Sequence, residues 1–241
     1  GIAPLLLLPL AACGGGSGSE GGDDPFSAEL IKSPGDENSA GQSGEGEEED
    51  AGQSGEGVGQ ESSEDQKVEF RGETSGEIRA DVTGSGTTFS RGDEQSVIAG
   101  TNVFANGGVN IDIPAGATLV VDVRDIPQQG ALRVSGEGKV RIDATGINDD
   151  LSVEVDIDAG GLVVDMPAED TESIDLTGEI DLNGGELVVD DGQLILSNTT
   201  LEDIGGGSVN SALVINASQL DSIAGAFAGE GEVRVVGFSD E

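Results

Sequence analysis

The sequence predicts an all-β domain and favours a β-solenoid, in which short strands coil repeatedly around one elongated core. Three features indicate this fold: runs that alternate between apolar and polar residues, glycine-rich turns between those runs, and repeated phrases. The repeats define units of roughly 20–25 residues, as expected for coils stacked on one another. Because the registers of the repeats are irregular, a two-sheet β-sandwich built from duplicated hairpins is the alternative.

The first twelve residues form an apolar run that ends in small side chains before Cys13. The run is too short to cross a bilayer core, which needs roughly 20 apolar residues, but it fits the apolar part of a secretory signal peptide. Since no Met and no basic stretch precede it, we expect that the sequence begins inside its own signal peptide, residues 1–12. The glycine-rich residues 14–19 that follow are typical of a flexible tether.

The segment Leu10-Ala11-Ala12-Cys13 resembles a bacterial lipobox, which the lipoprotein signal peptidase recognises. The resemblance implies that Leu10, Ala11 and Ala12 are recognition positions, and that Cys13 is acylated and becomes the mature N-terminus. Several acyl chains on one residue provide the more-than-single-chain anchor that stable membrane attachment requires. The implied partner is a membrane, reached through lipid on Cys13, in the bacterial cell envelope. Because Gly14 rather than an Asp follows the cysteine, the resemblance implies the outer membrane if the host is Gram-negative.

Residues 13–66 predict a lipidated, disordered, acidic linker between the membrane and the domain. They are rich in Gly, Ser, Glu, Asp and Gln, and the phrase Ala-Gly-Gln-Ser-Gly-Glu-Gly occurs at 40–46 and again at 51–57. Low hydrophobicity and like charges favour an extended chain over a packed one. The one apolar patch, residues 26–31, predicts no more than a transient helical turn.

Composition excludes several classes of function. A net charge of −38 excludes nucleic acid as a partner, because binding to phosphates needs clustered Lys and Arg. With no His and a single Cys, the chain has no imidazole base, no His-ligated metal, no internal disulfide and no Cys-based zinc site. Trp and Tyr, the usual stacking platforms for sugars, are also absent from the sequence. We therefore expect no cofactor and no catalysis.

The domain is predicted to span residues 67–241, where strand patterns and turn signals alternate. Residues 109–113 and 151–157 alternate apolar and polar side chains, the pattern of a half-buried strand. Glycine-containing turn signals follow at 106–108, 159–161, 183–185 and 191–192. The only helical turns that the sequence predicts lie at 198–204 and 217–227.

Internal similarities carry the solenoid prediction. They pair 136–142 with 229–235 and 194–204 with 213–223, and they repeat the phrase Leu-Val-Val-Asp at 119–122, 162–165 and 187–190. Residues 115–238 as a whole resemble the Gly-, Asp- and Val-rich repeats of bacterial surface and adhesin-like proteins. That resemblance implies a structural or adhesive role at the cell surface.

These features favour a non-catalytic surface lipoprotein with a structural or adhesive β-domain. A lipoprotein that captures a surface glycan or a divalent metal is the alternative, and a polysaccharide-degrading hydrolase is a remote one. The hydrolase would need two facing carboxylates, and its only candidates are the adjacent pairs 149–150 and 190–191. Adjacent acids on a strand point to opposite faces, which argues against that chemistry.

Three short motifs in the domain match recognition patterns of two kinds. Arg91-Gly92-Asp93 is the tripeptide of integrin ligands, and Asn198 and Asn216 each begin an N-glycosylation pattern. All three motifs consist of residues that are common in turns, and we expect turns at these positions.

Overall fold

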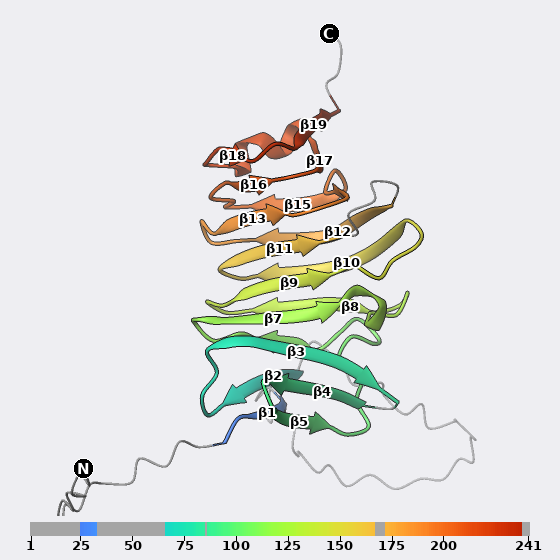
Figure 1. Cartoon of the computed structure of the whole chain (residues 1–241), viewed down its shortest axis with the longest axis vertical. Helices are drawn as coiled ribbons and strands as arrows, with labels where there is room; N and C mark the ends of the chain where they lie inside the picture. The colour runs from blue at the N-terminus through green and yellow to red at the C-terminus, as the bar shows by residue number, and fades with distance from the viewer. Residues whose placement is uncertain (1–24, 33–65, 85, 167–171, 238–241) are drawn as a thin grey trace, which may run out of the picture.

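The chain is a β-solenoid of about six turns. The computed structural model describes residues 25–32, 66–84, 86–166 and 172–237. Successive coils stack along the long axis, with β1–β5 at one end and β17–β19 at the other (Figure 1). The solenoid prediction is therefore confirmed over the sandwich, because most neighbouring strands are parallel and come from successive coils.

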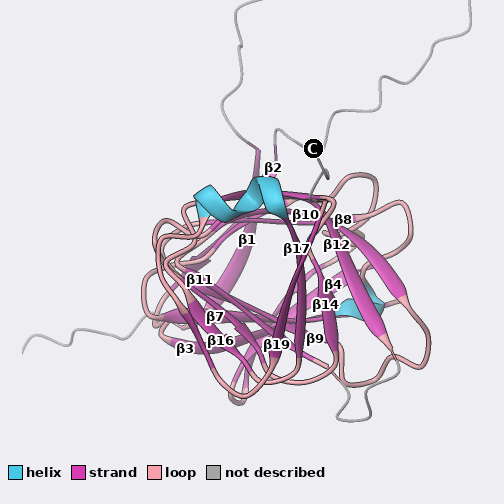
Figure 2. Cartoon of the chain, turned by 90° about the horizontal axis from the view of Figure 1, so that it is seen from above, coloured by secondary structure: helices cyan, strands magenta, loops and turns pink. Residues whose placement is uncertain are grey.

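The strands form two sheets. Sheet A contains, in spatial order, β1 (Ser27–Lys32), β2 (Gln66–Arg71), β6 (Asn110–Asp112), β8 (Ala131–Ser135), β10 (Leu151–Asp158), β12 (Ser173–Asp181), β14 (Gln193–Ile195), β17 (Ala212–Asn216) and β19 (Glu232–Val236), with β15 (Thr199–Glu202) also paired to β12. Sheet B contains β18 (Phe227–Ala228), β16 (Gly207–Val209), β13 (Glu186–Val189), β11 (Gly161–Asp165), β9 (Lys139–Asp143), β7 (Ala117–Asp122), β3 (Gly76–Thr83), β4 (Gly86–Arg91) and β5 (Glu94–Ile98). Short 3₁₀ helices, η2 (Val123–Asp125) and η3 (Ala217–Ser222), follow β7 and β17. Figure 2 looks along the stack and shows the strands around the interior, with η3 along one side.

Parallel pairing places equivalent residues of successive coils side by side. In sheet A, the inward positions of four neighbouring strands fall 23 residues apart, at Ile111, Val134, Ile157 and Ile180. All four side chains are buried. Because each apolar residue lies on its counterpart in the next coil, one continuous core runs the length of the stack.

The repeated phrase Leu-Val-Val-Asp marks the strands of sheet B. Its three copies are β7, β11 and the strand-to-turn segment of β13, and β9 lies between the first two with Val-Arg-Ile-Asp at the same register. The first residues of these four segments form one buried column: Leu119, Val140, Leu162 and Leu187.

The other two similarities have different outcomes. The similarity of 194–204 to 213–223 is one coil, because Leu194 lies beside Leu213 and Ile204 beside Ile223. The similarity of 136–142 to 229–235 does not mark equivalent places, because the first copy turns into β9 of sheet B and the second into β19 of sheet A. The same sequence pattern, a glycine-containing turn followed by a short strand, therefore occurs in both sheets.

The N-terminal end of the stack is closed by antiparallel strands. β1 pairs antiparallel with β2, and β3, β4 and β5 form consecutive antiparallel pairs. Three phenylalanines pack there: Phe26 stacks on Phe70 with ring centroids 5.9 Å apart, and Phe70 meets Phe89 edge-on at 5.3 Å. Ser96 of β5 joins the two sheets, since its hydroxyl accepts from the amide of Ala28 at 3.0 Å and donates to the carbonyl of the same residue at 3.2 Å.

Two local predictions were wrong. Residues 26–31, predicted as a transient helical turn inside the linker, contain most of β1, because pairing with β2 and packing of Phe26 supply partners that are distant in sequence. Residues 198–204, predicted as a helical turn, contain β15, which is held on β12 by parallel pairing. The helical turn predicted in 217–227 is confirmed as η3.

Leu162→Ala tests whether the core column of sheet B carries the stability of the stack. Leu162 is fully buried between Val140 and Leu187, so the substitution should lower the free energy of unfolding by about 2–5 kcal/mol. Urea unfolding followed by circular dichroism measures this loss. Val97→Ala is the matched control, because that side chain is 60 % exposed and its truncation should cost less than about 0.5 kcal/mol. A loss below about 1 kcal/mol for Leu162→Ala would contradict the continuous core.

Candidate functional site

The outer face of sheet A carries two columns of polar side chains that run along the stack. What we call the Arg133 column contains Lys67, Asn110, Arg133, Asp156, Glu179 and Thr200. The Asp158 column contains Glu69, Asp112, Ser135, Asp158, Asp181 and Glu202. Neighbours within a column are directly opposite across adjacent strands, which lie about 4.8 Å apart in a sheet.

A groove of about 310 Å³ lies where the two columns cross β6, β8 and β10. We call it the Arg133 groove, and it is lined by Asn110, Arg133, Val134, Ser135, Asp156 and Asp158. The Arg133 guanidinium donates to the carbonyl of Gly107 at 2.5 Å through Nε and to Asp156 at 3.0 Å through Nη1. The Asn110 amide donates to the Ser135 hydroxyl at 3.0 Å. The groove thus presents an ordered set of amide, hydroxyl, guanidinium and carboxylate groups.

A second hollow of about 300 Å³ is lined by residues of the neighbouring strands β2 and β6 and the turn after them: Glu69, Phe70, Asp112 and Pro114. Lys67 lies beside it, with its ammonium 2.5 Å from the Glu69 carboxylate and 3.9 Å from that of Asp112. The hydrogen bond to Glu69 raises the pKa of Lys67 above its ordinary value. One cation therefore serves two carboxylates of the Asp158 column.

Further along the same column, Asp158 and Asp181 lie directly opposite each other. Like charges in that arrangement repel and destabilise a sheet. Asn183 lies between them and donates to both, from its side-chain amide to Asp158 at 2.7 Å and from its backbone amide to Asp181 at 2.9 Å. A neutral donor thus reduces the repulsion at this step of the stack.

The outer face of sheet B is different, because its acids are paired with arginines. Asp122, Asp143 and Asp165 form a column at the ends of β7, β9 and β11. They meet Arg124, Arg79 and Arg141 respectively, and the Arg79 to Asp143 distance is 3.6 Å. This face is a network of ion pairs.

Two carboxyls near this network have pKa values shifted in opposite directions. Hydrogen bonds from Arg124 lower the pKa of Asp122. Burial raises the pKa of Asp81, and the charge of Arg79 offsets part of that effect.

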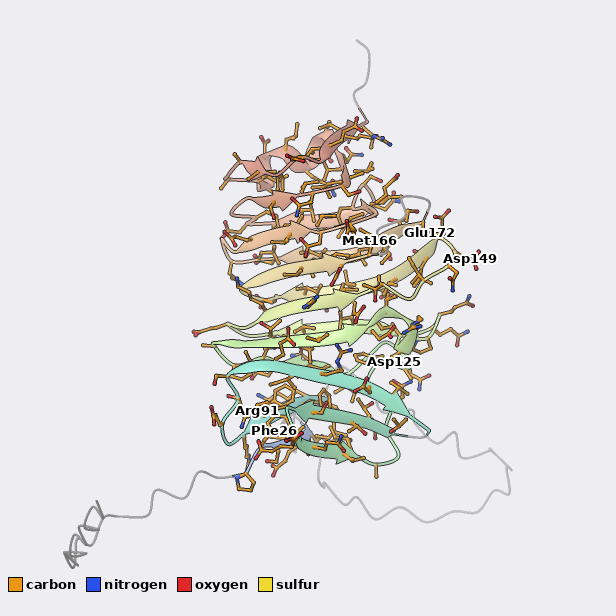
Figure 3. The ribbon with its side chains drawn as sticks, viewed as in Figure 1. Phe26, Arg91, Asp125, Asp149, Met166 and Glu172 are labelled. Carbon is orange, nitrogen blue, oxygen red and sulfur yellow. The ribbon has the colours of Figure 1, made fainter. Side chains whose placement is uncertain are left out.

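Two of the four hydrolase candidates accept hydrogen bonds from the neighbouring coil. Asp150 accepts from the amide and the hydroxyl of Ser173, both at 2.9 Å, which ties the turn before β10 to the first residue of β12. Asp149 projects from the same side of the stack as Glu172 (Figure 3). Asp190 accepts from the Asn210 side chain at 3.2 Å. The hydrogen bonds of Asp150 and Asp190 therefore join successive coils.

The integrin-type tripeptide forms the turn between β4 and β5. The Arg91 guanidinium is engaged by Glu94 at 2.8 Å and by Glu73 at 3.5 Å, and its side chain is only 21 % exposed. Figure 3 places Arg91 at the N-terminal end of the stack. Arg91 therefore forms ion pairs within the N-terminal end of the solenoid.

Of the glycosylation patterns, Asn198 lies in the expected turn but its next two residues begin β15, and Asn216 ends β17. Asn198 donates to Asp175 of the coil below at 3.3 Å. Asn216 caps η3, accepting from the amide of Ser218 at 3.0 Å, while its own amide donates to Gln219 at 2.6 Å. Asn198 thus bonds to strand β12 of the preceding coil, and Asn216 bonds to the 3₁₀ helix that it caps.

The lipobox residues Leu10, Ala11, Ala12 and Cys13 lie outside the described residues, as does most of the predicted linker. Within the described part of the chain, no three acidic or sulfur side chains are grouped so that they could hold a metal ion. In the same part, none of the helices has the length and apolar character needed to span a bilayer. Comparison with known protein families, curated proteins and solved structures finds no match to the chain.

Sequence reasoning missed the Arg133 groove, although a signal for it is present. Its column positions recur every 23 residues, at Asn110, Arg133, Asp156 and Glu179. The residue types differ at each step, so no repeated phrase indicates the period. Aligning the buried positions at the same interval would have found it.

Asp122→Asn and Asp81→Asn should change stability in opposite directions at about pH 7. The folded pKa of Asp122 is lowered, so its contribution is present above the unfolded pKa and disappears as pH falls through the folded value. The folded pKa of Asp81 is raised, so its charged form is disfavoured by folding, and its neutral replacement should stabilise the protein near neutrality. Each effect should stay below about 1 kcal/mol because these groups are partly solvated.

Thermal unfolding of both variants at about pH 7 and about pH 2 measures the effects. The Asp81→Asn difference should vanish at the lower pH, where the parent carboxyl is also neutral, and the Asp122→Asn difference should shrink as the pH falls through the lowered folded pKa of Asp122. Equal effects of the same sign at neutral pH would contradict the assignment of their environments.

Proposed function

We propose that the protein is a non-catalytic lipoprotein of the bacterial cell envelope, anchored through lipid on Cys13, whose β-solenoid is a stiff structural or adhesive module. The lipobox-like Leu10-Ala11-Ala12-Cys13 supports the anchor. The observation that carries the structural role is the in-register stack of parallel coils around one unbroken core. Such a stack resists bending, because each coil is hydrogen-bonded and packed against both neighbours.

The position of β1 revises how the module is attached. β1 begins at Ser27, and Phe26 before it packs on Phe70 at the N-terminal end, so under the proposal the tether from Cys13 is residues 14–25. Twelve residues span at most about 43 Å when fully extended. Under the proposal, the closed end faces the membrane and the coils extend away from it. β1 and β2, between which the acidic segment 33–65 lies in the sequence, are then both at the membrane-proximal end.

Cys13→Ala tests the anchor. With a complete signal peptide restored upstream, the parent chain expressed in a bacterium should fractionate with membranes, and its mature N-terminal peptide should carry an acylated Cys13 by mass spectrometry. The Cys13→Ala chain should lose the acyl mass and the membrane association. The Ser17→Ala chain is the matched control, and it should behave as the parent. An unmodified Cys13 with the upstream residues still attached would contradict the proposed anchor.

Capture of a neutral glycan is a second candidate function, and the Arg133 groove favours it. The groove combines amide, hydroxyl, guanidinium and carboxylate groups in fixed positions, which suits the hydrogen-bonding pattern of sugar hydroxyls. A neutral glycan fits better than an acidic one, because a net charge of −38 repels polyanions.

Titration with neutral oligosaccharides, followed by amide NMR shifts, tests this second function. Shifts should concentrate on β6, β8 and β10, and Asp156→Ala should weaken binding by about tenfold or more through loss of a charged hydrogen-bonding group. Glu77→Ala, on the opposite sheet and 65 % exposed, is the control and should leave binding unchanged. Shifts spread evenly over both sheets would count against the groove.

A further inference from the structure

The last coil leaves both sheets with open edges. Among the described strands, β19 pairs only with β17 and β18 only with β16. Four large apolar side chains of the described chain are exposed, and three of them lie on this coil: Leu220 at 42 %, Val233 at 38 % and Val236 at 41 %. An exposed strand edge with apolar side chains beside it is a template for pairing with another strand.

The N-terminal end shows how this chain covers the end of its own core. There, β1 and β4 run antiparallel to the coil strands, β5 pairs antiparallel with β4, and Phe26, Phe70 and Phe89 pack together beside them. No comparable strand or aromatic group covers the last coil in the part of the chain that the structure describes. The two ends of the core are therefore unequal.

Val233 identifies the layer that is missing. It lies on Leu213 of the preceding coil, which is fully buried, and both belong to the inward-facing side of sheet A. In the coils below, the corresponding side chain is covered by the next strand. An added strand with an apolar residue opposite Val233 would extend the core by one layer.

We propose that the added strand is β19 of a second copy of this chain, paired antiparallel about a two-fold axis through Val233. In that register Val233 meets its own counterpart on the inward face. Glu232 then lies opposite Arg234 of the other copy, and Arg234 opposite the other copy's Glu232. Directly opposite residues share a face in an antiparallel pair, so both ion pairs form on the outer side of the sheet.

The charges of β19 select this register over its neighbours. A two-fold axis through Arg234 would place two guanidinium groups opposite each other, which is destabilising. An axis through Val235 would place Arg234 opposite Val236 of the other copy. Glu232 would then lie opposite a position past the end of the other copy's β19, so neither charge would meet its opposite. Within a single chain, Glu232 and Arg234 are already 2.8 Å apart on the same face, so both are positioned to exchange partners.

The pairing joins two solenoids at the ends that lie farthest from β1 (Figure 1). The dimer itself does not depend on the lipid anchor. If the proposed anchor at Cys13 is also correct, the two membrane attachments lie at opposite ends of the dimer, and the contact links chains from two facing surfaces.

Sedimentation velocity of the unacylated 241-residue chain tests the proposal by a charge swap. At about 0.15 M salt the Debye length is about 8 Å, so repulsion between distant charges is screened while close pairs persist. The parent chain should show a monomer–dimer equilibrium. Arg234→Glu and Glu232→Arg should each raise the dissociation constant about tenfold or more, because each places like charges opposite each other. The double variant should restore the dissociation constant to within about threefold of the parent.

Two further variants separate this interface from other contacts. Val233→Asp should abolish the dimer, and circular dichroism should show an unchanged fold because the side chain lies at the open end. Val97→Asp, on the exposed edge at the opposite end, should leave the dimer intact. A parent chain that stays monomeric at sub-millimolar concentration, a dimer that survives Arg234→Glu, or a double variant that fails to recover would each overturn the proposal.

Discussion

The structure depends on one constraint: each inward side chain of a coil must lie on its counterpart in the next coil. Hydrogen bonding between parallel strands fixes that register, so the length of a coil can change only in its turns. Sheet A keeps an interval of 23 residues from Ile111 to Ile180, and the interval then shortens to 19 between Leu194 and Leu213. The shortening takes place where β12 is followed by both β14 and β15. Irregular repeats in the sequence are therefore compatible with a regular core.

The same constraint acts on the outer faces, where it creates a problem for an acidic chain. Parallel in-register stacking places outward carboxylates of successive coils directly opposite each other. The whole sequence has 48 acidic residues and only ten basic ones, so few cations can separate them. Sheet B solves this with arginines such as Arg141, which pairs with Asp165. Sheet A uses Lys67, Arg133 and, further along, the neutral donor Asn183. Its groove lies where the Arg133 column changes from amide to cation to carboxylate.

The sequence indicates what is local and periodic. The alternation in 151–157, the phrase Leu-Val-Val-Asp and the 19-residue offset each arise from contacts between neighbouring coils, and the structure confirms the strands that they predict. The sequence did not predict β1 because its partner β2 lies beyond a long polar segment. The six residues of β1 by themselves are too short a pattern to indicate a strand. The sequence did not predict the Arg133 groove, because the positions of its column recur at a fixed interval while the residue types at those positions differ. The lipobox stays a prediction from sequence, since Cys13 lies outside the described residues.

A stack of coils has no internal reason to stop, so its two ends decide how it behaves toward other molecules. The N-terminal end reverses strand direction and adds three phenylalanine rings that cover the end of the core, although β1 and β5 remain edge strands. At the other end, β19 pairs with β17 alone among the described strands, and Val233 on its inward face is partly exposed. One more strand would therefore continue both the sheet and the core. Its Glu232 and Arg234 could serve to block pairing, as charges on natural edge strands often do. Glu232 and Arg234 have opposite charges and lie on either side of Val233. A two-fold axis through Val233 therefore places each of them opposite its counter-charge in the other copy, and the two copies attract each other at this edge. A run of like charges would have protected the edge against every partner, including a second copy.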